Sequence, residues 1–148
     1  MVSKPDRVVI TGKVNRMILI SSTVHKCERA THKSAGYDIR ANGEYHLMPG
    51  EVKVIGTGIW VEMPDDVMGM VCSRSGLASR GIVVNNAPGI IDADYKNEVK
   101  VILMNQTDDI YPVNDGDKIA QLVFTKWLDA GDVVFIHREG GFGSTGDK

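Results

Sequence analysis

The chain has 148 residues, which suits a single domain, and carries a formal net charge of −2 at pH 7. That charge argues against a dedicated nucleic-acid surface, which is normally basic. The sequence contains no apolar run of membrane-spanning length and no signal-peptide core at its start. The two cysteines, Cys27 and Cys72, match no zinc motif. We therefore expect reduced thiols in a soluble, cytoplasmic protein with no membrane partner.

Short apolar runs separated by turn residues follow one another along the chain. Residues 1–16 are mixed and polar, and we expect an N-terminal extension or an edge strand there. Strands are predicted from the alternation of apolar and polar residues at 17–20, 44–47, 51–55, 59–63, 68–72, 99–103, 110–113 and 118–124. Gly56 and Gly58 are expected to interrupt the pattern between two of these strands.

Turn residues separate the predicted strands. Pro49-Gly50 and Asp65-Asp66 predict turns, and Asp115-Gly116 predicts a hairpin that joins the last two strands. Asp117, in the same turn, is interpreted as structural. Residues 75–80 allow at most one or two helical turns, and no segment keeps helical spacing for longer. The pattern therefore predicts an all-β sandwich, barrel or jelly roll with at most one short helix.

The chain is organised around residues 85–99, which read NNAPGIIDADYKNEV. Pro88-Gly89 forces a bend, and Ile90-Ile91 then leads to two carboxylates, Asp92 and Asp94. Loops on rigid sheets are where chemistry is usually mounted, so an acid at the entrance to a buried strand is a candidate catalytic group. Because aspartate is also common in turns, the alternative is a structural acid, and we favour that interpretation for Asp94.

A second polar cluster, Ser73-Arg74-Ser75-Gly76, directly follows a predicted strand. The guanidinium group offers a planar fork of donors that matches phosphate oxygens, and serine hydroxyls and backbone N–H groups add further donors. The alternative is a helix start in which Ser75 is the cap and Arg74 is exposed. These residues alone do not separate the two interpretations.

The C-terminal residues 137–146 combine glycines with an arginine, an aromatic residue and two hydroxyls. Glycine lets backbone N–H groups approach an anion closely, and Phe142 offers a surface on which a base can stack. The alternative is a disordered tail. Because a free tail has little use for a phenylalanine, we favour a lid that orders when a ligand binds.

Five blocks of sequence, taken in order, resemble the trimeric all-β deoxyuridine triphosphatases, which cleave dUTP to dUMP and pyrophosphate. The blocks are AGYDIRA (35–41), SRSGLA (73–78), NAPGIIDADYKNEV (86–99), GDKIAQLVF (116–124) and GGFGSTG (140–146). One such block could arise by chance, but five in order do not. The resemblance implies a single-domain distorted β-barrel or jelly roll of the dUTPase type, with a core at 17–136 and a flexible glycine-rich lid at 137–148.

The resemblance also implies how the nucleoside is bound. The third block would receive uracil between Asn86 and the backbone around Ile90, Ile91 and Lys100, with Tyr95 packed on the deoxyribose where a 2′-hydroxyl would collide. A site built to hydrogen-bond one edge of a base can reject analogues by about 10⁴–10⁵-fold, whereas a methyl clash contributes roughly 1–3 kcal/mol.

For the chemistry, the resemblance implies that Asp92 is the catalytic base, which aligns a water with the α-phosphorus. Magnesium would be held mainly by the phosphates and by waters, with Asp38 in the outer shell through a water. The groups implied to bind substrate around the phosphates and in the lid are Arg74, Ser75, Gly76, Gln121, Arg138, Phe142, Gly143, Ser144 and Thr145. The resemblance further implies a homotrimer with shared active sites and no direct nucleic-acid partner. The implied cellular role is to keep uracil out of DNA and to supply dUMP for thymidylate synthesis.

The sequence departs from the family's pattern in three places. His137 stands where the family usually has arginine, so we assign that role to Arg138, one residue closer to Phe142. The connection from Gln121 to Phe142 is shorter than usual, and Ser73 replaces a proline.

Two other functions stay open at this stage. One is a dCTP deaminase of the same superfamily, although Glu98, the only glutamate near the third block, stands where ordinary dUTPases carry one. The other is a nucleotide-gated interaction protein that uses dUTP as a signal.

Overall fold

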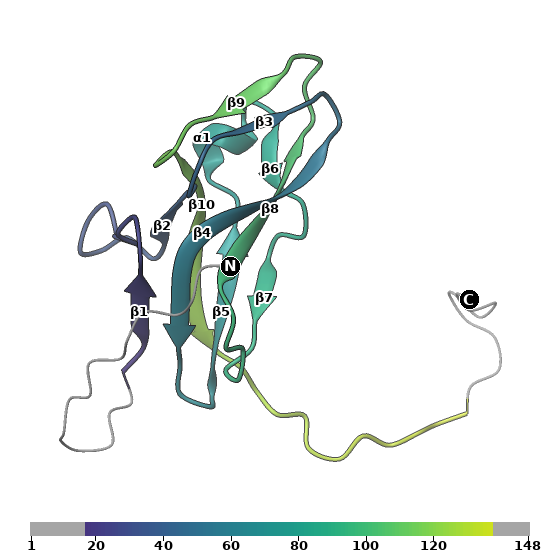
Figure 1. Cartoon of the computed structure of the whole chain (residues 1–148). Helices are drawn as coiled ribbons and strands as arrows, with labels where there is room; N and C mark the ends of the chain where they lie inside the picture. Colours follow the sequence, from purple (N-terminus) through teal and green to yellow (C-terminus); the bar gives the residue numbers. More distant parts are fainter. Residues whose placement is uncertain (1–16, 138–148) are drawn as a thin grey trace.

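Two four-stranded antiparallel sheets and a two-stranded ribbon form the body of the protein (Figure 1). The computed structural model describes residues 17–137, so the predicted extension at 1–16 and residues 138–148 of the predicted lid lie outside the described residues. The elements are β1 Leu19–Ser22, β2 Tyr37–Arg40, β3 Tyr45–Leu47, β4 Val52–Glu62, β5 Val67–Cys72, α1 Ser75–Ala78, β6 Ile82–Val84, β7 Gly89–Ile91, β8 Val99–Asn105, β9 Tyr111–Val113 and β10 Lys118–Lys126. The strand orders are β1-β4-β8-β6, β2-β10-β5-β7 and β3-β9.

The hydrophobic core lies between the two four-stranded sheets. Val101 and Leu103 of β8 are fully buried, whereas Lys100 between Val99 and Val101 is exposed, because side chains alternate between the two faces of a strand. Ile39 of β2 and Leu122 of β10 close the core from the second sheet. The prediction of an all-β, jelly-roll-like fold with one short helix is therefore confirmed, and the sheets stay separate rather than closing into one barrel.

No two consecutive strands among the described residues pair with each other. The hairpin predicted at Asp115-Gly116 is therefore wrong. Gly116, with φ of +83°, does turn the chain, but the strand before it pairs with β3 and the strand after it pairs with β2 and β5. The turn passes the chain from the ribbon into the second sheet, and this is how a jelly roll differs from a meander of hairpins.

Gly56 and Gly58 do not end a strand, contrary to the prediction. β4 runs through both glycines, and its register with β8 shifts between Ile55 and Ile59. Gly58 has φ of +67°, so the two glycines supply the local bend of a β-bulge. The two strands predicted on either side of them are one long strand.

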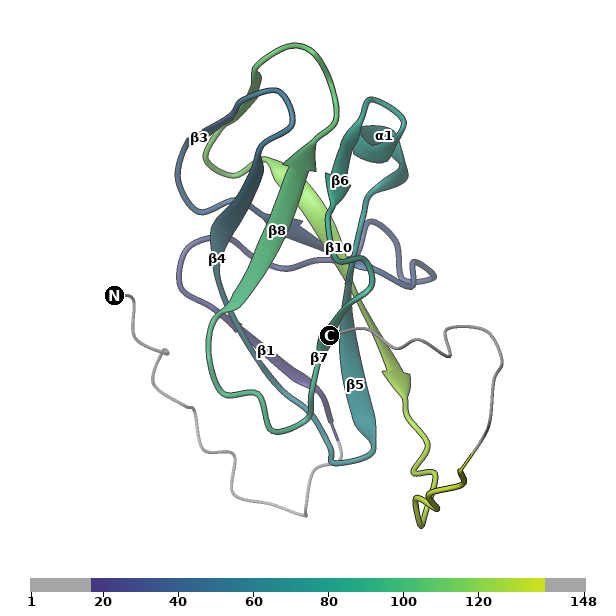
Figure 2. The same ribbon diagram turned by 90° about the vertical axis from the view of Figure 1, so that its right-hand side faces the viewer.

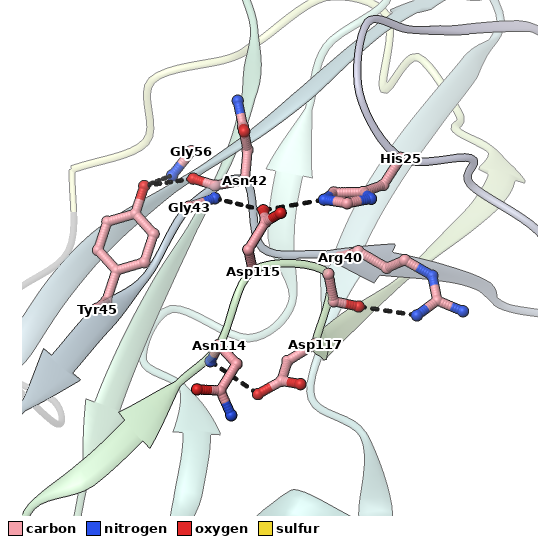
Figure 3. Close-up of polar contacts among 10 residues, drawn as sticks. His25, Arg40, Asn42, Gly43, Tyr45, Gly56, Asn114, Asp115 and Asp117 are labelled. Atoms are coloured by element: carbon pink, nitrogen blue, oxygen red, sulfur yellow. Dashed lines mark hydrogen bonds and ion pairs between the residues drawn. The ribbon is translucent and has the colours of Figure 1, made fainter.

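The turns at one end of the sheets are joined by side-chain hydrogen bonds (Figure 3). Asp115 Oδ1 accepts a hydrogen bond from the Gly43 N–H at 2.8 Å and contacts His25 Nε2 at 3.0 Å. Arg40 Nη1 donates to the Gly116 carbonyl at 2.8 Å. These contacts connect the turn between β9 and β10 to the segment before β2, to the end of β2 and to the turn that follows it.

Three further hydrogen bonds in Figure 3 stabilise the same end. Tyr45 Oη donates to the Asn42 carbonyl at 2.9 Å and accepts from the Gly56 N–H at 3.3 Å. Asp117 Oδ2 accepts from the Asn114 N–H at 2.9 Å, which agrees with the interpretation of Asp117 as a structural turn residue.

The chain after β10 leaves the sheets (Figure 1). Trp127 Nε1 donates to the Asp65 carbonyl at 2.9 Å, and beyond it Leu128 and Phe135 are 93% and 91% exposed. Within residues 17–137, no helix is long and apolar enough to cross a membrane.

Acid should weaken the contacts made by Asp115. Its hydrogen bonds from the Gly43 N–H and then from His25 hold the pKa of the carboxyl below its ordinary value of 3.8. The ionised carboxylate therefore stabilises the fold above that value, and the contribution is lost as the pH falls through the lowered pKa. We expect Asp115→Asn to be less stable than the wild type near neutral pH, and the difference to close in strong acid. Urea unfolding from about pH 7 to about pH 2 checks this; a constant difference would contradict it.

Candidate active site

One cavity gathers the residues expected to bind the base and the sugar. It has a volume of about 150 Å³ and lies where β7 meets β5 and β8. Its lining includes all five residues predicted for this role, together with three others: Asn86, Ile90, Ile91, Tyr95 and Lys100, with Val71, Gly89 and Val99. Residues that precede the two carboxylates and residues that follow them therefore line the same small pocket.

Local hydrogen bonds and one close approach shape this pocket. A Cβ on Gly89 would lie 3.0 Å from Asn86 Nδ2, so the Asn86 amide packs directly over that glycine. The Tyr95 N–H donates to the Asp92 carbonyl at 3.0 Å, and Tyr95 Oη donates to the Glu98 carbonyl at 2.8 Å. Tyr95 is thus hydrogen-bonded through both its backbone and its ring hydroxyl, and it forms one wall of the pocket.

A second cavity, of about 310 Å³, gathers the residues expected around the phosphates and the metal. Its lining includes all five described residues predicted for that role, together with five others: Asp38, Arg74, Ser75, Gly76 and Gln121, with Ala30, Ser34, Ala35, Gly36 and Lys118. They come from the segment before β2, from β2, from the start of α1 and from β10.

Charged groups inside the second cavity are paired. Arg74 Nε lies 3.2 Å from Asp38 Oδ1, and Lys118 Nζ lies 3.1 Å from Asp38 Oδ2. Arg74 Nη1 also donates to the Lys118 carbonyl at 3.3 Å. The alternative in which Ser75 caps the helix is wrong, because Arg74 occupies the N-cap position and makes no side-chain cap bond.

Gln121 is fixed from two sides of the second cavity. Its Nε2 donates to the Ser73 carbonyl at 2.9 Å. A Cβ on Gly36 would lie 2.2 Å from Gln121 Oε1, so only glycine fits at that position without displacing the amide. The Ser73 hydroxyl accepts a hydrogen bond from the Val84 N–H at 2.8 Å.

Both cysteines are free thiols, as expected. Burial, together with the nearby negative charge of Asp38, raises the pKa of the Cys27 thiol to about 12. Burial also raises the pKa of Cys72. A thiol with a raised pKa is a poor nucleophile near neutral pH, so the chemistry of this site depends on other groups.

The predicted catalytic residue, Asp92, is separated from the second cavity. Ile91 pairs with Gly69, so Asp92 is level with Met68 near the start of β5, whereas Arg74 lies beyond the other end of the same strand. Six residues at about 3.3 Å each put roughly 20 Å between the two backbone positions. Figure 2 shows α1 above β5 and the turn after β7 at its lower end.

The side chain of Asp92 is exposed. It lines a third cavity, of about 610 Å³, together with Asp65, Met68, Ala93, Asp94 and Trp127. Within one chain, therefore, the candidate base does not share a cavity with the residues expected to bind phosphate.

Some predicted site residues cannot be placed. Arg138, Phe142, Gly143, Ser144 and Thr145 lie outside the described residues. Five lining residues of the second cavity were not predicted, and two of them, Gly36 and Lys118, contact the predicted residues Gln121 and Asp38 closely. Both belong to blocks that were recognised, but neither side-chain type nor spacing distinguished them from their neighbours.

Comparisons with known proteins identify the family of the chain. The sequence model of the dUTPase family matches residues 22–146. The chain is 42% identical over 126 residues to the deoxyuridine 5′-triphosphate nucleotidohydrolase of Anaplasma marginale. The matched region covers 79% of this chain and 86% of that relative. The chain is 41% identical over 128 residues to the nucleotidohydrolase of the same name from Rickettsia felis, and the matched region covers 80% and 86%.

Solved structures show the same similarity. A mutant dUTPase from phage phi11 of S. aureus, described with a coordinated structural Mg(II) ion, has a TM-score of 0.71 and 27% identity and covers 84% of this chain and 99% of its own. The dUTPase of Staphylococcus bacteriophage 80alpha with dUpNHpp has a TM-score of 0.73 and 26% identity and covers 89% and 99%.

Two glycines of the second cavity should respond differently to alanine. Gly36→Ala should displace the Gln121 amide from Ser73 and reduce the free energy of unfolding by about 1–3 kcal/mol, because the added methyl overpacks a filled site. Gly76→Ala is the matched control, since a Cβ there meets nothing within 4 Å, and we expect a change within about 0.5 kcal/mol. Denaturant unfolding of both variants measures the difference; equal stabilities would contradict the packing argument.

Proposed function

The chain belongs to the dUTPase family, and we propose that it hydrolyses dUTP to dUMP and pyrophosphate. The observation that carries this proposal is the sorting of the predicted residues into two cavities. Those expected to contact uracil and deoxyribose line one cavity, and those expected to contact phosphate line the other.

The first cavity selects the nucleoside in this proposal. The Asn86 amide and nearby backbone groups hydrogen-bond the edge of uracil, and the tight turn that carries them excludes the methyl group of thymine. Tyr95 packs on the deoxyribose and excludes a 2′-hydroxyl. The hydrogen-bonded part of this selection is the stronger part, because a wrong base leaves buried polar groups unpaired.

Asp92 acts as the general base on the attacking water. The carboxylate accepts a proton as the water attacks the α-phosphorus in line with the departing pyrophosphate. A carboxylate is a weak base, so much of its effect comes from holding the water in the attacking position. Arg74, Ser75 and Gly76 bind the phosphate oxygens and stabilise the charge that develops on them, and Gln121 is a polar contact in the same region.

The second cavity fits a magnesium ion that is held mainly by the substrate. No group of three or more His, Cys, Asp or Glu among residues 17–137 could hold a metal by itself, and Mg²⁺ retains waters and prefers phosphate oxygens. In this proposal Asp38 would contact the ion through a water. When bound, the ion neutralises phosphate charge and orients the triphosphate.

We further propose a homotrimer in which each active site combines two chains. The distance between Asp92 and Arg74 along β5 supports this proposal, because both groups must reach one triphosphate. A neighbouring chain can bring its own first cavity and Asp92 to the second cavity of this one. The glycine-rich tail, with Arg138 and Phe142, would close over the assembled site. The predicted cytoplasmic location of the protein stays a prediction.

Other functions are distinguished by their products. A dCTP deaminase would release ammonia from dCTP, and a nucleotide-gated interaction protein would bind a partner in a dUTP-dependent manner. Neither alternative is favoured by a feature of the described residues.

Removing the proposed base should abolish turnover but not binding. We expect Asp92→Asn to lower kcat for dUTP by roughly 10²–10⁴-fold, while the protein still binds dUpNHpp. Asp94→Asn is the matched control, because Asp94 is interpreted as a structural acid, and it should retain most of the activity. Pyrophosphate release measures both variants; equal turnover of dTTP or UTP by the wild type would contradict the proposed selectivity.

Mixing two inactive variants should restore activity if the sites are shared. Arg74→Met and Asp92→Asn each leave every site with one defective half. Coexpressed chains that assemble at random bring two intact halves together in roughly a quarter of the sites, so about that fraction of the wild-type rate should return. A mixture as inactive as its components would mean that each site is built from one chain.

A further inference from the structure

A β-bulge turns Lys118 into the second cavity. In an unbroken strand, residues 118 and 121 would point to opposite faces of the sheet, because their spacing is odd. The pairing of β10 with β2 instead shifts its register, from Gln121 opposite Asp38 to Lys118 opposite Arg40. The extra residue lies between them, and Ile119 and Ala120 are both buried. Bulges commonly re-aim a side chain next to a functional site.

The bulge completes a compact group of three charges. Each oxygen of the Asp38 carboxylate contacts a different cation, Arg74 at 3.2 Å and Lys118 at 3.1 Å. The Asp38 side chain is only 17% exposed, whereas those of the two cations are 34% and 36% exposed. Two cations and one carboxylate leave a net charge of +1 beside the phosphate-binding groups, and without Lys118 that charge would be zero.

We propose that Lys118 is a positioning residue for Asp38, which keeps the carboxylate oriented toward the metal-bound water while Arg74 binds the phosphates. The inference rests on the proposed function of the second cavity. When an anion draws the Arg74 guanidinium toward itself, the Asp38 carboxylate loses part of its partner and faces phosphate oxygens of the same sign. Lys118 then remains as the cation that holds it in place.

Magnesium pyrophosphate is a probe that tests this role without turnover. Calorimetry gives the affinity for pyrophosphate with and without saturating Mg²⁺, and the ratio measures how much the ion strengthens binding. We expect Lys118→Met to reduce this ratio by roughly 10-fold or more, as is usual when an outer-shell partner is removed. Lys118→Arg, which keeps the charge, should restore most of it. In an Asp38→Asn background, Lys118→Met should leave the ratio unchanged, because Lys118 acts through Asp38.

Lys126→Met is the matched control on the same strand. Lys126 Nζ also pairs with an aspartate, Asp66 at 3.5 Å, but the lysine side chain is 76% exposed and lies outside the second cavity. Its removal should leave the ratio at the wild-type value, and thermal unfolding shows whether each variant is folded.

Three results would overturn the proposal. In the first, Lys118→Met weakens metal-free pyrophosphate binding but leaves the ratio unchanged, which would make Lys118 a direct phosphate ligand. In the second, only the thermal stability falls, which would make its role structural. In the third, Asp38→Asn and Lys118→Met each reduce the affinity ratio and the double variant shows both reductions in full, which would mean that Lys118 does not act through Asp38. Failure of the wild type to release pyrophosphate from dUTP would instead overturn the proposed function, and the calorimetric ratios would still decide the role of Lys118.

Discussion

The pairing of β5 with β7 on one side and β10 on the other determines how the site is divided. The hydrogen-bonded pairing fixes the register of the strands, and the rise per residue along each strand is constant. No rotation of a side chain can therefore bring the turn after β7 to the loop before α1. The first cavity with its neighbouring Asp92 and the second cavity with Arg74 are therefore parts of two different surfaces of one chain. If the site acts on one triphosphate, self-association is a requirement of its geometry and not only a source of stability.

The parts of the fold that could be predicted are those governed by local pattern. Val99, Val101 and Leu103 alternate with polar or less buried residues, and they form a buried face as expected. Strand partners could not be predicted, because every pairing joins segments distant in sequence. Asp115-Gly116 carries the local signal of a hairpin, yet the flanking strands find partners in different sheets. On either side of Gly56 and Gly58, pairing with β8 and, after Gly58, with β1 maintained a strand that local propensity would have ended.

The site was predictable in its chemistry more than in its geometry. Arg74, Asp38 and Gln121 belong to recognisable blocks, and they do lie around one cavity. Their mutual contacts depend on details that residue type does not encode. Lys118 faces Asp38 only because one extra residue in β10 reverses the alternation, and the need for glycine at Gly36 arises from an amide on a distant strand. The separation of Asp92 from Arg74 likewise follows from register, which the sequence pattern leaves undetermined.

The central position of β10 has a consequence for how the chain folds during synthesis. β10 lies between β2 and β5, so the second sheet cannot form until residues 118–126 have left the ribosome. At a synthesis rate of about 5–20 residues per second, β10 is completed roughly 4–17 s after β2. During that interval the edges of β2 and β5 are unpaired, and exposed strand edges can pair with those of other nascent chains. The protein is thus expected to fold largely after translation, with a dependence on chaperones that its small size would not suggest.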